Sequence, residues 1–225
     1  MVRSEARDRC PGAVPARYPA RTPIVGLALA ALALAACNTT APPLKGESAS
    51  SVVAGTVHVC SSCHGPGGRS ISSTFPRLAG QQKDYIEAQL KAFRDHTRAD
   101  PHAKTYMWGM AARLSDPTIE AIAAYYATQT PVAGEPASSP EITAGKKIFT
   151  AGIPSQSVPA CMACHGDKAQ GNGPIPRLAG QHPAYLARQL EAFASNARAN
   201  VIMHQNSKNL TAAQISEVTV YLATQ

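Results

Sequence analysis

The sequence predicts an all-α protein built from two tandem domains. The segment Phe75-Pro-Arg-Leu-Ala-Gly-Gln81 returns 100 residues later as Ile175-Pro-Arg-Leu-Ala-Gly-Gln181. Within each copy, apolar residues follow the three- and four-residue spacing of a helix, and the alternating pattern of a strand is absent. Self-similarity at a fixed offset indicates that each copy is a structural unit with its own core.

The duplication sets the expected domain boundaries. The offset of 100 continues to Arg98 and Arg198, and after a four-residue difference an offset of 96 pairs the remainder, up to 127–129 with 223–225. Between the copies, the Pro-, Ser- and Ala-rich run over 131–140 has the composition of a linker. We therefore expect one domain over 51–130, a linker over 131–140 and a second domain over 141–225.

Helical spacing and capping residues place helices in both repeats. One helix is expected from the shared spacing of Tyr85, Ile86, Gln89, Leu90 and Phe93, and its counterpart from residues 185, 186, 189, 190 and 193. Ser115 and Thr211 can cap a final helix in each repeat. The apolar residues of these final helices are Ile119, Ile122 and Tyr126 in one repeat and Ile215, Val218 and Leu222 in the other. An opening helix is expected over 141–150, whereas the equivalent segment of the first repeat, about 51–60, runs directly into a cysteine motif.

That motif, Cys-x-x-Cys-His, occurs once in each repeat, as Cys60-Ser-Ser-Cys63-His64 and as Cys161-Met-Ala-Cys164-His165. It is the attachment signature of c-type haem. The two thiols can add to the vinyl groups of one porphyrin, and the adjacent imidazole can bind its iron. Zinc knuckles or disulfides are the alternatives, but a histidine follows each cysteine pair directly and the pairs are about a hundred residues apart. We therefore predict two covalently bound haem c groups.

The second axial ligand of each iron decides between a carrier and a catalyst, because a filled position excludes substrate. Met107 precedes Leu114 by seven residues, and Met203 precedes Leu210 by seven. Met110 would correspond to Asn206 and has no equivalent. We predict Met107 and Met203 as the distal ligands, the alternative being that both only pack in the core. The histidines without a counterpart are expected to be surface or packing residues: His58, His96, His102, His182 and His204.

The repeated Pro-Arg-Leu-Ala-Gly-Gln element is expected to support each site. The carbonyl groups of Pro76 and Pro176 can accept a hydrogen bond from the ligating imidazole, which fixes the ring and raises its basicity. Leu78 and Leu178 are expected to line the haem pocket. Four arginines are either partners of haem propionates or solvated surface residues: Arg77, Arg98, Arg177 and Arg198. Tyr85 and Tyr185 contact either the haem or the domain interface.

The first 36 residues have the features of a secretory signal. Residues 1–23 contain five arginines, and the run from Ile24 to Ala36 is uncharged. The end of this run, Leu34-Ala35-Ala36-Cys37, resembles the lipobox of bacterial lipoproteins. That resemblance implies cleavage before Cys37, diacylation of its thiol, a polar tether over 37–50 and a protein anchored to a membrane in the periplasm. The alternative is ordinary cleavage nearby and a soluble periplasmic protein.

Net charge argues against nucleic acid as a partner. The formal charge of the full chain is +7, but removal of residues 1–36 leaves 16 basic and 12 acidic residues. Two haems would add about four propionate charges and bring the total near neutral. No basic run remains in the rest of the chain.

Residues 51–225 resemble the dihaem cytochrome c4 family. The resemblance rests on the two Cys-x-x-Cys-His units, the two Pro-x-Leu-Ala-Gly-Gln segments and the two distal segments from methionine to leucine. It implies two class I cytochrome c-like domains related by a pseudo-twofold axis, with haem irons that carry electrons and catalyse no reaction. It also implies a quinol–cytochrome c reductase and a terminal oxidase as redox partners. The alternatives are an electron-transfer subunit of a larger dehydrogenase or oxidase, and a dihaem enzyme such as a peroxidase.

Overall fold

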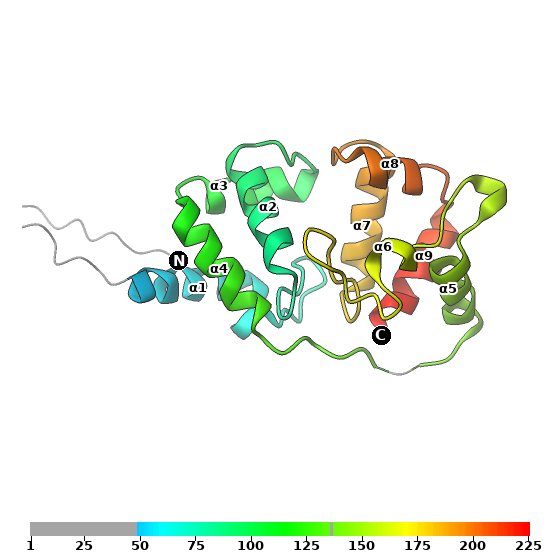
Figure 1. Cartoon of the computed structure of the whole chain (residues 1–225), viewed down its shortest axis with the longest axis horizontal. Helices are drawn as coiled ribbons and strands as arrows, with labels where there is room; N and C mark the ends of the chain where they lie inside the picture. Colours follow the sequence, from blue (N-terminus) through cyan, green and yellow to red (C-terminus); the bar gives the residue numbers. More distant parts are fainter. Residues whose placement is uncertain (1–48, 136) are drawn as a thin grey trace, which may run out of the picture. The chain divides into compact units, whose positions relative to one another are not determined.

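The computed structural model describes residues 49–135 and 137–225, and these residues are helical (Figure 1). The helices of the first repeat are α1 (Ala49–His64), the 3₁₀ turn η1 (Pro66–Gly68), α2 (Lys83–Arg94), the π-helical η2 (Ala103–Met107), α3 (Trp108–Ala111) and α4 (Asp116–Ala127). Those of the second are α5 (Pro140–Ala151), the 3₁₀ turn η3 (Pro154–Gln156), α6 (Met162–His165), α7 (Pro183–Ala194), α8 (Val201–Ser207) and α9 (Ala212–Ala223). In this part of the chain, β structure is limited to two isolated bridges, so the predicted all-α class is confirmed.

The predicted signal over 1–36, Cys37 and nearly all of the predicted tether lie outside the described residues. Among the helices that the structure describes, none combines the length and the apolar character needed to cross a bilayer.

The final helix of each repeat begins at the capping residue that the sequence predicts. The Ser115 hydroxyl oxygen accepts a hydrogen bond from the Thr118 N–H at the start of α4. At the start of α9, the Thr211 hydroxyl accepts from the Gln214 N–H, and the Gln214 side chain accepts from the Thr211 N–H in return. These bonds satisfy N–H groups that the first turn of a helix leaves unpaired, which fixes where α4 and α9 begin.

Each repeat has its own apolar core, as the duplication predicts. In the first repeat, α2 and α4 bury Ile86, Leu90, Ile119, Ile122 and Tyr126. In the second, α5, α7 and α9 bury Phe149, Leu186, Val218, Tyr221 and Leu222. Burial of an aliphatic or aromatic side chain of this size stabilises the fold by about 1.5–3 kcal/mol. The apolar faces that the sequence predicts for α2, α4, α7 and α9 therefore point into the cores.

Helices α5 and α9 approach one another closely at Gly145. A Cβ atom built on Gly145 would lie 2.0 Å from the carbonyl oxygen of Glu217 and 2.9 Å from the Cβ atom of Tyr221. A Cβ atom on Gly109 of α3 would meet no heavy atom within 4 Å. Glycine is thus required by packing at Gly145 and not at Gly109.

The two repeats contact each other through glutamines of the repeated segment. The Gln181 side chain accepts from the Arg77 N–H (2.9 Å) and donates to the Arg77 carbonyl (2.9 Å). The Gln81 side chain makes the same two bonds to Arg177, at 2.7 and 2.9 Å. Because equivalent residues of the two repeats make the same bonds to each other, the contact has the predicted pseudo-twofold symmetry.

Candidate cofactor sites

Each Cys-x-x-Cys-His motif presents two free thiols beside a buried imidazole. The four motif cysteines are free: Cys60, Cys63, Cys161 and Cys164. Burial raises the pKa of Cys60, and it raises that of Cys161 to about 11, so both remain protonated thiols at neutral pH. Within the described ranges, no group of three or more His, Cys, Asp and Glu side chains is arranged to hold a metal ion.

The motif belongs to the opening helix in the first repeat and to a separate short helix in the second. In the first, α1 continues without a break through Cys60 to His64, as the sequence predicts. In the second, α5 ends before Gly152, which has a φ of +70°, and the separate short helix α6 carries the motif histidine. In both repeats the residue after the histidine is a glycine with positive φ (+76° at Gly65 and +81° at Gly166), a conformation that glycine adopts at little cost. This turn directs the following chain back across the histidine.

Both motif histidines donate a hydrogen bond to the predicted proline carbonyl. The distance from His64 Nδ1 to the Pro76 oxygen is 2.9 Å, and that from His165 Nδ1 to the Pro176 oxygen is 3.0 Å. Because a carbonyl oxygen only accepts, the proton lies on Nδ1 and Nε2 keeps its lone pair. Burial lowers the pKa of both histidines, against the opposing effect of these bonds, and so favours the neutral form that binds a metal. The supporting role predicted for the two prolines is confirmed.

An apolar hollow of about 380 Å³ lies beside the first motif. Its lining includes Cys60, Leu90, Met107, Met110, Leu114 and Ile122. The size and apolar lining are typical of cofactor pockets, and the set of thiol and thioether groups beside a buried imidazole fits c-type haem. Met107 is half-buried against the cores of the first repeat, whereas Met110 is 48% exposed. Since both side chains line the hollow, the choice of Met107 stays a prediction from the duplication.

In the second repeat, Met203 lies in the first turn of α8. The side-chain oxygen of Asn200 caps this helix and accepts a hydrogen bond from the Met203 N–H at 2.9 Å. The neighbouring His204 donates from Nδ1 to the Phe193 carbonyl (2.9 Å), which is consistent with the packing role expected for it. The cap fixes the backbone of Met203, the predicted distal ligand.

The four-residue difference between the repeats falls at the helix that carries the predicted distal methionine. Residues 101–111 form one helical stretch whose middle, η2, is π-helical, whereas α8 has seven residues. The π-helical segment ends at Met107 itself. A wider π turn inside a helix changes the direction in which the following side chains point, and such turns are frequent at functional sites. The added residues of the first repeat therefore coincide with the π-helical segment just before the predicted ligand Met107.

The arginines considered as propionate partners lie at the contact between the repeats. Arg98 and Arg198 are 8% and 7% exposed, so the alternative of solvated surface residues is wrong for both. Arg77 donates from Nε to the Ser70 carbonyl and from Nη1 to the Gly180 carbonyl. The Nε atom of Arg177 is buried without a hydrogen-bond partner in the described structure. An acceptor that a cofactor brings would satisfy it, which favours the propionate alternative for Arg177.

Two further residues lie at the interface, one that the sequence offered as an alternative and one that it did not indicate. The Tyr85 hydroxyl accepts from Arg198 Nη2 of the other repeat (3.0 Å), so Tyr85 contacts the domain interface. His182 is buried and donates from Nε2 to the Ser70 carbonyl across the interface (3.0 Å). The counterpart of His182 is Gln82, so the duplication gave no signal for this contact.

Comparisons with known proteins agree with the sites. The family model of cytochrome c matches the chain twice, over residues 55–130 and 142–225. A cytochrome c-552 of Acidithiobacillus ferridurans is 45% identical over 170 residues, which cover 73% of this chain and 72% of that protein. The solved cytochrome c4 structure of Acidithiobacillus ferrooxidans has a TM-score of 0.70 at 44% identity and covers 74% of this chain and 98% of its own. A thiosulfate dehydrogenase electron acceptor of Thiomonas intermedia is 36% identical, with 74% of this chain and 78% of that protein covered.

Two helical domains with one attachment motif each define a class of protein that holds two covalent haems in tandem. The chain belongs to the cytochrome c family, among the dihaem proteins of the cytochrome c4 type. It is an electron carrier, and its two haem c groups are attached through Cys60 and Cys63 and through Cys161 and Cys164.

Proposed function

We propose that the protein carries electrons in the bacterial periplasm from a quinol–cytochrome c reductase to a terminal oxidase. The observation that carries this proposal is the fixed imidazole of each repeat, bonded through Nδ1 to a proline carbonyl with Nε2 free. When bound, each haem supplies an iron that changes between the ferrous and ferric states. His64 and His165 would hold one axial position, and Met107 and Met203 the other.

The residues around each site suit electron transfer better than catalysis. The proline carbonyl fixes the imidazole plane, so the ligand has the same orientation in both oxidation states. A methionine thioether at the second axial position raises the reduction potential and leaves no position for a substrate. Apolar side chains line most of the hollow beside Met107 and would limit access of water to a ligand there.

Kinetics with isolated respiratory complexes test the proposed partners. We expect quinol to reduce the ferric holoprotein only when a quinol–cytochrome c reductase is added, and a terminal oxidase to reoxidise the product in air. Stopped-flow absorbance of the haem bands measures both steps. Failure of both complexes to react, with a holoprotein that dithionite reduces fully, would contradict this assignment of partners.

A second function is favoured by one specific observation. A relative that is 36% identical over 174 residues is named as a thiosulfate dehydrogenase electron acceptor. The same two-haem arrangement could accept electrons from an enzyme that oxidises a sulfur compound, because fold and ligation do not determine the partner. Rapid reduction by thiosulfate with its dehydrogenase, together with no reduction through the reductase, would select this function.

Lipidation of Cys37 is a separate part of the proposal, supported by the lipobox-like sequence before it. We expect Cys37→Ser to release the mature protein from the membrane fraction into the soluble periplasmic fraction. Cys10→Ser is the matched control, because Cys10 lies in the segment that would be removed. Fractionation of cells, followed by haem staining, measures the distribution. Equal membrane association of wild type and Cys37→Ser would exclude a lipid anchor at this residue.

A further inference from the structure

The hydrogen bond that orients each motif histidine ends on a peptide group that the other repeat also contacts. In the first repeat, the carbonyl of Pro76 accepts from His64 Nδ1 at 2.9 Å. The N–H of the same peptide group belongs to Arg77 and donates to the side-chain oxygen of Gln181 at 2.9 Å. A peptide group is planar and rigid, so bonds at its carbonyl and at its N–H together fix its orientation. One peptide group thus lies between the histidine of the first repeat and a glutamine of the second.

The second repeat contains the same arrangement. The Pro176 carbonyl accepts from His165 Nδ1 at 3.0 Å. The N–H of that peptide group belongs to Arg177 and donates to the side-chain oxygen of Gln81 at 2.7 Å. Each histidine is therefore connected, through one peptide group, to the repeat that does not contain it.

Both glutamine side chains are held in fixed positions. Gln81 and Gln181 are 7% and 6% exposed. Each side-chain oxygen also accepts from the N–H of the residue that follows it, at 2.9 Å for Gln81 and 3.1 Å for Gln181. Each side-chain amide donates to the carbonyl of the arginine in the other repeat, at 2.9 Å in both cases. With these bonds, the glutamine oxygens cannot turn away from the peptide groups without leaving buried polar groups unpaired.

The bond to the glutamine affects the bond to the histidine in two ways. It restricts rotation of the peptide group, which keeps the proline carbonyl directed at Nδ1. It also polarises this group, because hydrogen bonds in a chain strengthen one another in the protein interior. A stronger acceptor at Nδ1 makes the imidazole a more basic ligand and fixes its ring. The glutamine thus acts on the iron site without touching the histidine.

We propose that Gln81 and Gln181 are cross-repeat positioning residues: each orients the haem-ligand histidine of the other repeat through the peptide group between proline and arginine. This role rests on the proposed function in one respect, namely that His64 and His165 are axial ligands. The repeated Pro-Arg-Leu-Ala-Gly-Gln element then has two tasks. Its proline orients the histidine of its own repeat, and its glutamine orients that of the other.

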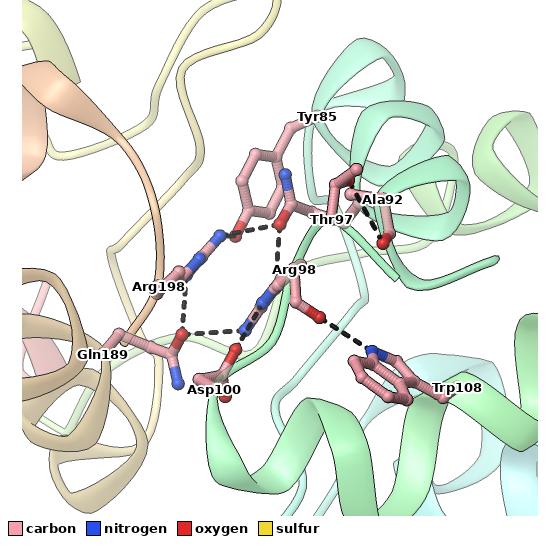
Figure 2. A network of polar contacts seen from close by, with 9 residues as sticks. Tyr85, Ala92, Thr97, Arg98, Asp100, Trp108, Gln189 and Arg198 are labelled. Carbon is pink, nitrogen blue, oxygen red and sulfur yellow. Dashed lines mark hydrogen bonds and ion pairs between the residues drawn. The ribbon is translucent and has the colours of Figure 1, made fainter. Parts of the chain in front are cut away.

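The contact between the repeats does not depend on these two glutamines alone. Arg98 donates from Nη2 to Gln189 of the other repeat at 2.7 Å, and Arg198 donates from Nη2 to the Tyr85 hydroxyl at 3.0 Å (Figure 2). These bonds do not involve the peptide groups next to the motif histidines. Loss of one glutamine amide is therefore expected to leave the contact in place.

Hydrogen exchange of the two imidazole N–H groups tests the proposal, measured by heteronuclear NMR of the reduced holoprotein in heavy water. Gln181→Met removes both hydrogen-bonding groups and keeps an unbranched side chain. We expect the Nδ1 proton of His64 to exchange about five- to tenfold faster, the equilibrium effect of one net hydrogen bond, and that of His165 to keep its rate. Gln81→Met should give the reverse, with faster exchange at His165 alone. A contact that is merely loosened would accelerate both protons.

Gln82→Met is the matched control. The Gln82 side chain also donates across the contact, from Nε2 to the Gln170 carbonyl at 2.8 Å, but it bonds neither peptide group. This variant should leave both exchange rates unchanged. If one of the two positioning variants does not fold, the other still tests the proposal, because each protein contains a second imidazole as an internal reference.

Any other pattern overturns the inference: unchanged rates, equal changes at both histidines, or the same effect in the control. The wild-type spectrum separates this result from failure of the proposed ligation, because the ring current of a haem shifts the ring protons of an axial imidazole far upfield. If both imidazoles show this shift and the exchange rates do not respond, only the role of the glutamines is wrong. If a wild-type imidazole lacks the shift, both proposals are wrong.

Discussion

Replacement of Met107 by alanine is expected to lower the reduction potential of the first haem by more than about 59 mV, a change of more than tenfold in its one-electron equilibrium. Loss of the thioether removes the axial ligand that favours the ferrous state and opens the iron to water. The methionine–iron charge-transfer band of that haem should disappear, and cyanide should bind to it. Redox titration and the ferric absorption spectrum measure these effects.

Met110→Ala is the matched control, because Met110 lines the same hollow but has no equivalent in the second repeat. It should leave both potentials and both charge-transfer bands intact. Met203→Ala should reproduce the effect of Met107→Ala in the second haem. The ligand assignment in the first repeat is wrong if the Met107 variant keeps its band and the Met110 variant loses it.

Gly145→Ala is expected to destabilise the second domain by about 3 kcal/mol, near the upper end for an overpacked core. Its Cβ atom would lie 2.0 Å from the backbone oxygen of Glu217, and backbone cannot move aside as a flexible side chain can. Helices α5 and α9 would therefore have to separate, which would loosen the packing of Phe149 against Tyr221. Denaturant unfolding of the holoprotein, followed by circular dichroism, measures the loss.

The matched control is Gly109→Ala in α3, outside the hollow, where the added methyl group meets no heavy atom within 4 Å. Alanine is favoured over glycine inside a helix by about 0.5–1 kcal/mol, so this variant should be as stable as wild type or slightly more stable. Equal destabilisation by the two substitutions would show that close packing of α5 on α9 is not what makes Gly145 necessary.

The local structure could be predicted from the sequence because its causes are local. The helical spacing from Tyr85 to Phe93 and the caps at Ser115 and Thr211 depend on residues within a few positions of each other. The proline carbonyls were predictable for a different reason. A histidine ligand needs an acceptor for its second N–H, and each repeat offers the same element after its motif.

The contacts between the repeats could not be predicted in the same way. Gln81 and Arg177 are far apart in sequence, and a spacing pattern contains no information about which side chains meet across an interface. The arginines at 98 and 198 were expected at haem propionates or on the surface, and their burial at the contact between the repeats excludes only the surface alternative. One sequence signal for this contact was available. A glutamine precedes each arginine by nine residues, and it lies on the same helix as buried apolar residues. The π-helical form of η2 also lay beyond the sequence, which showed only that four residues are added.

The exchanged bonds of Gln81 and Gln181 have a consequence for how the two halves can diverge. Their reciprocal pattern is that of an isologous interface, in which the same surface patch is used on both sides. In a dimer of identical chains, every substitution would occur on both sides of the axis at once. Because one polypeptide contains both halves here, one side can acquire a carboxylate while its mirror position keeps an amide. Because the two halves are joined in one chain, the two sides of a symmetric contact can acquire different residues.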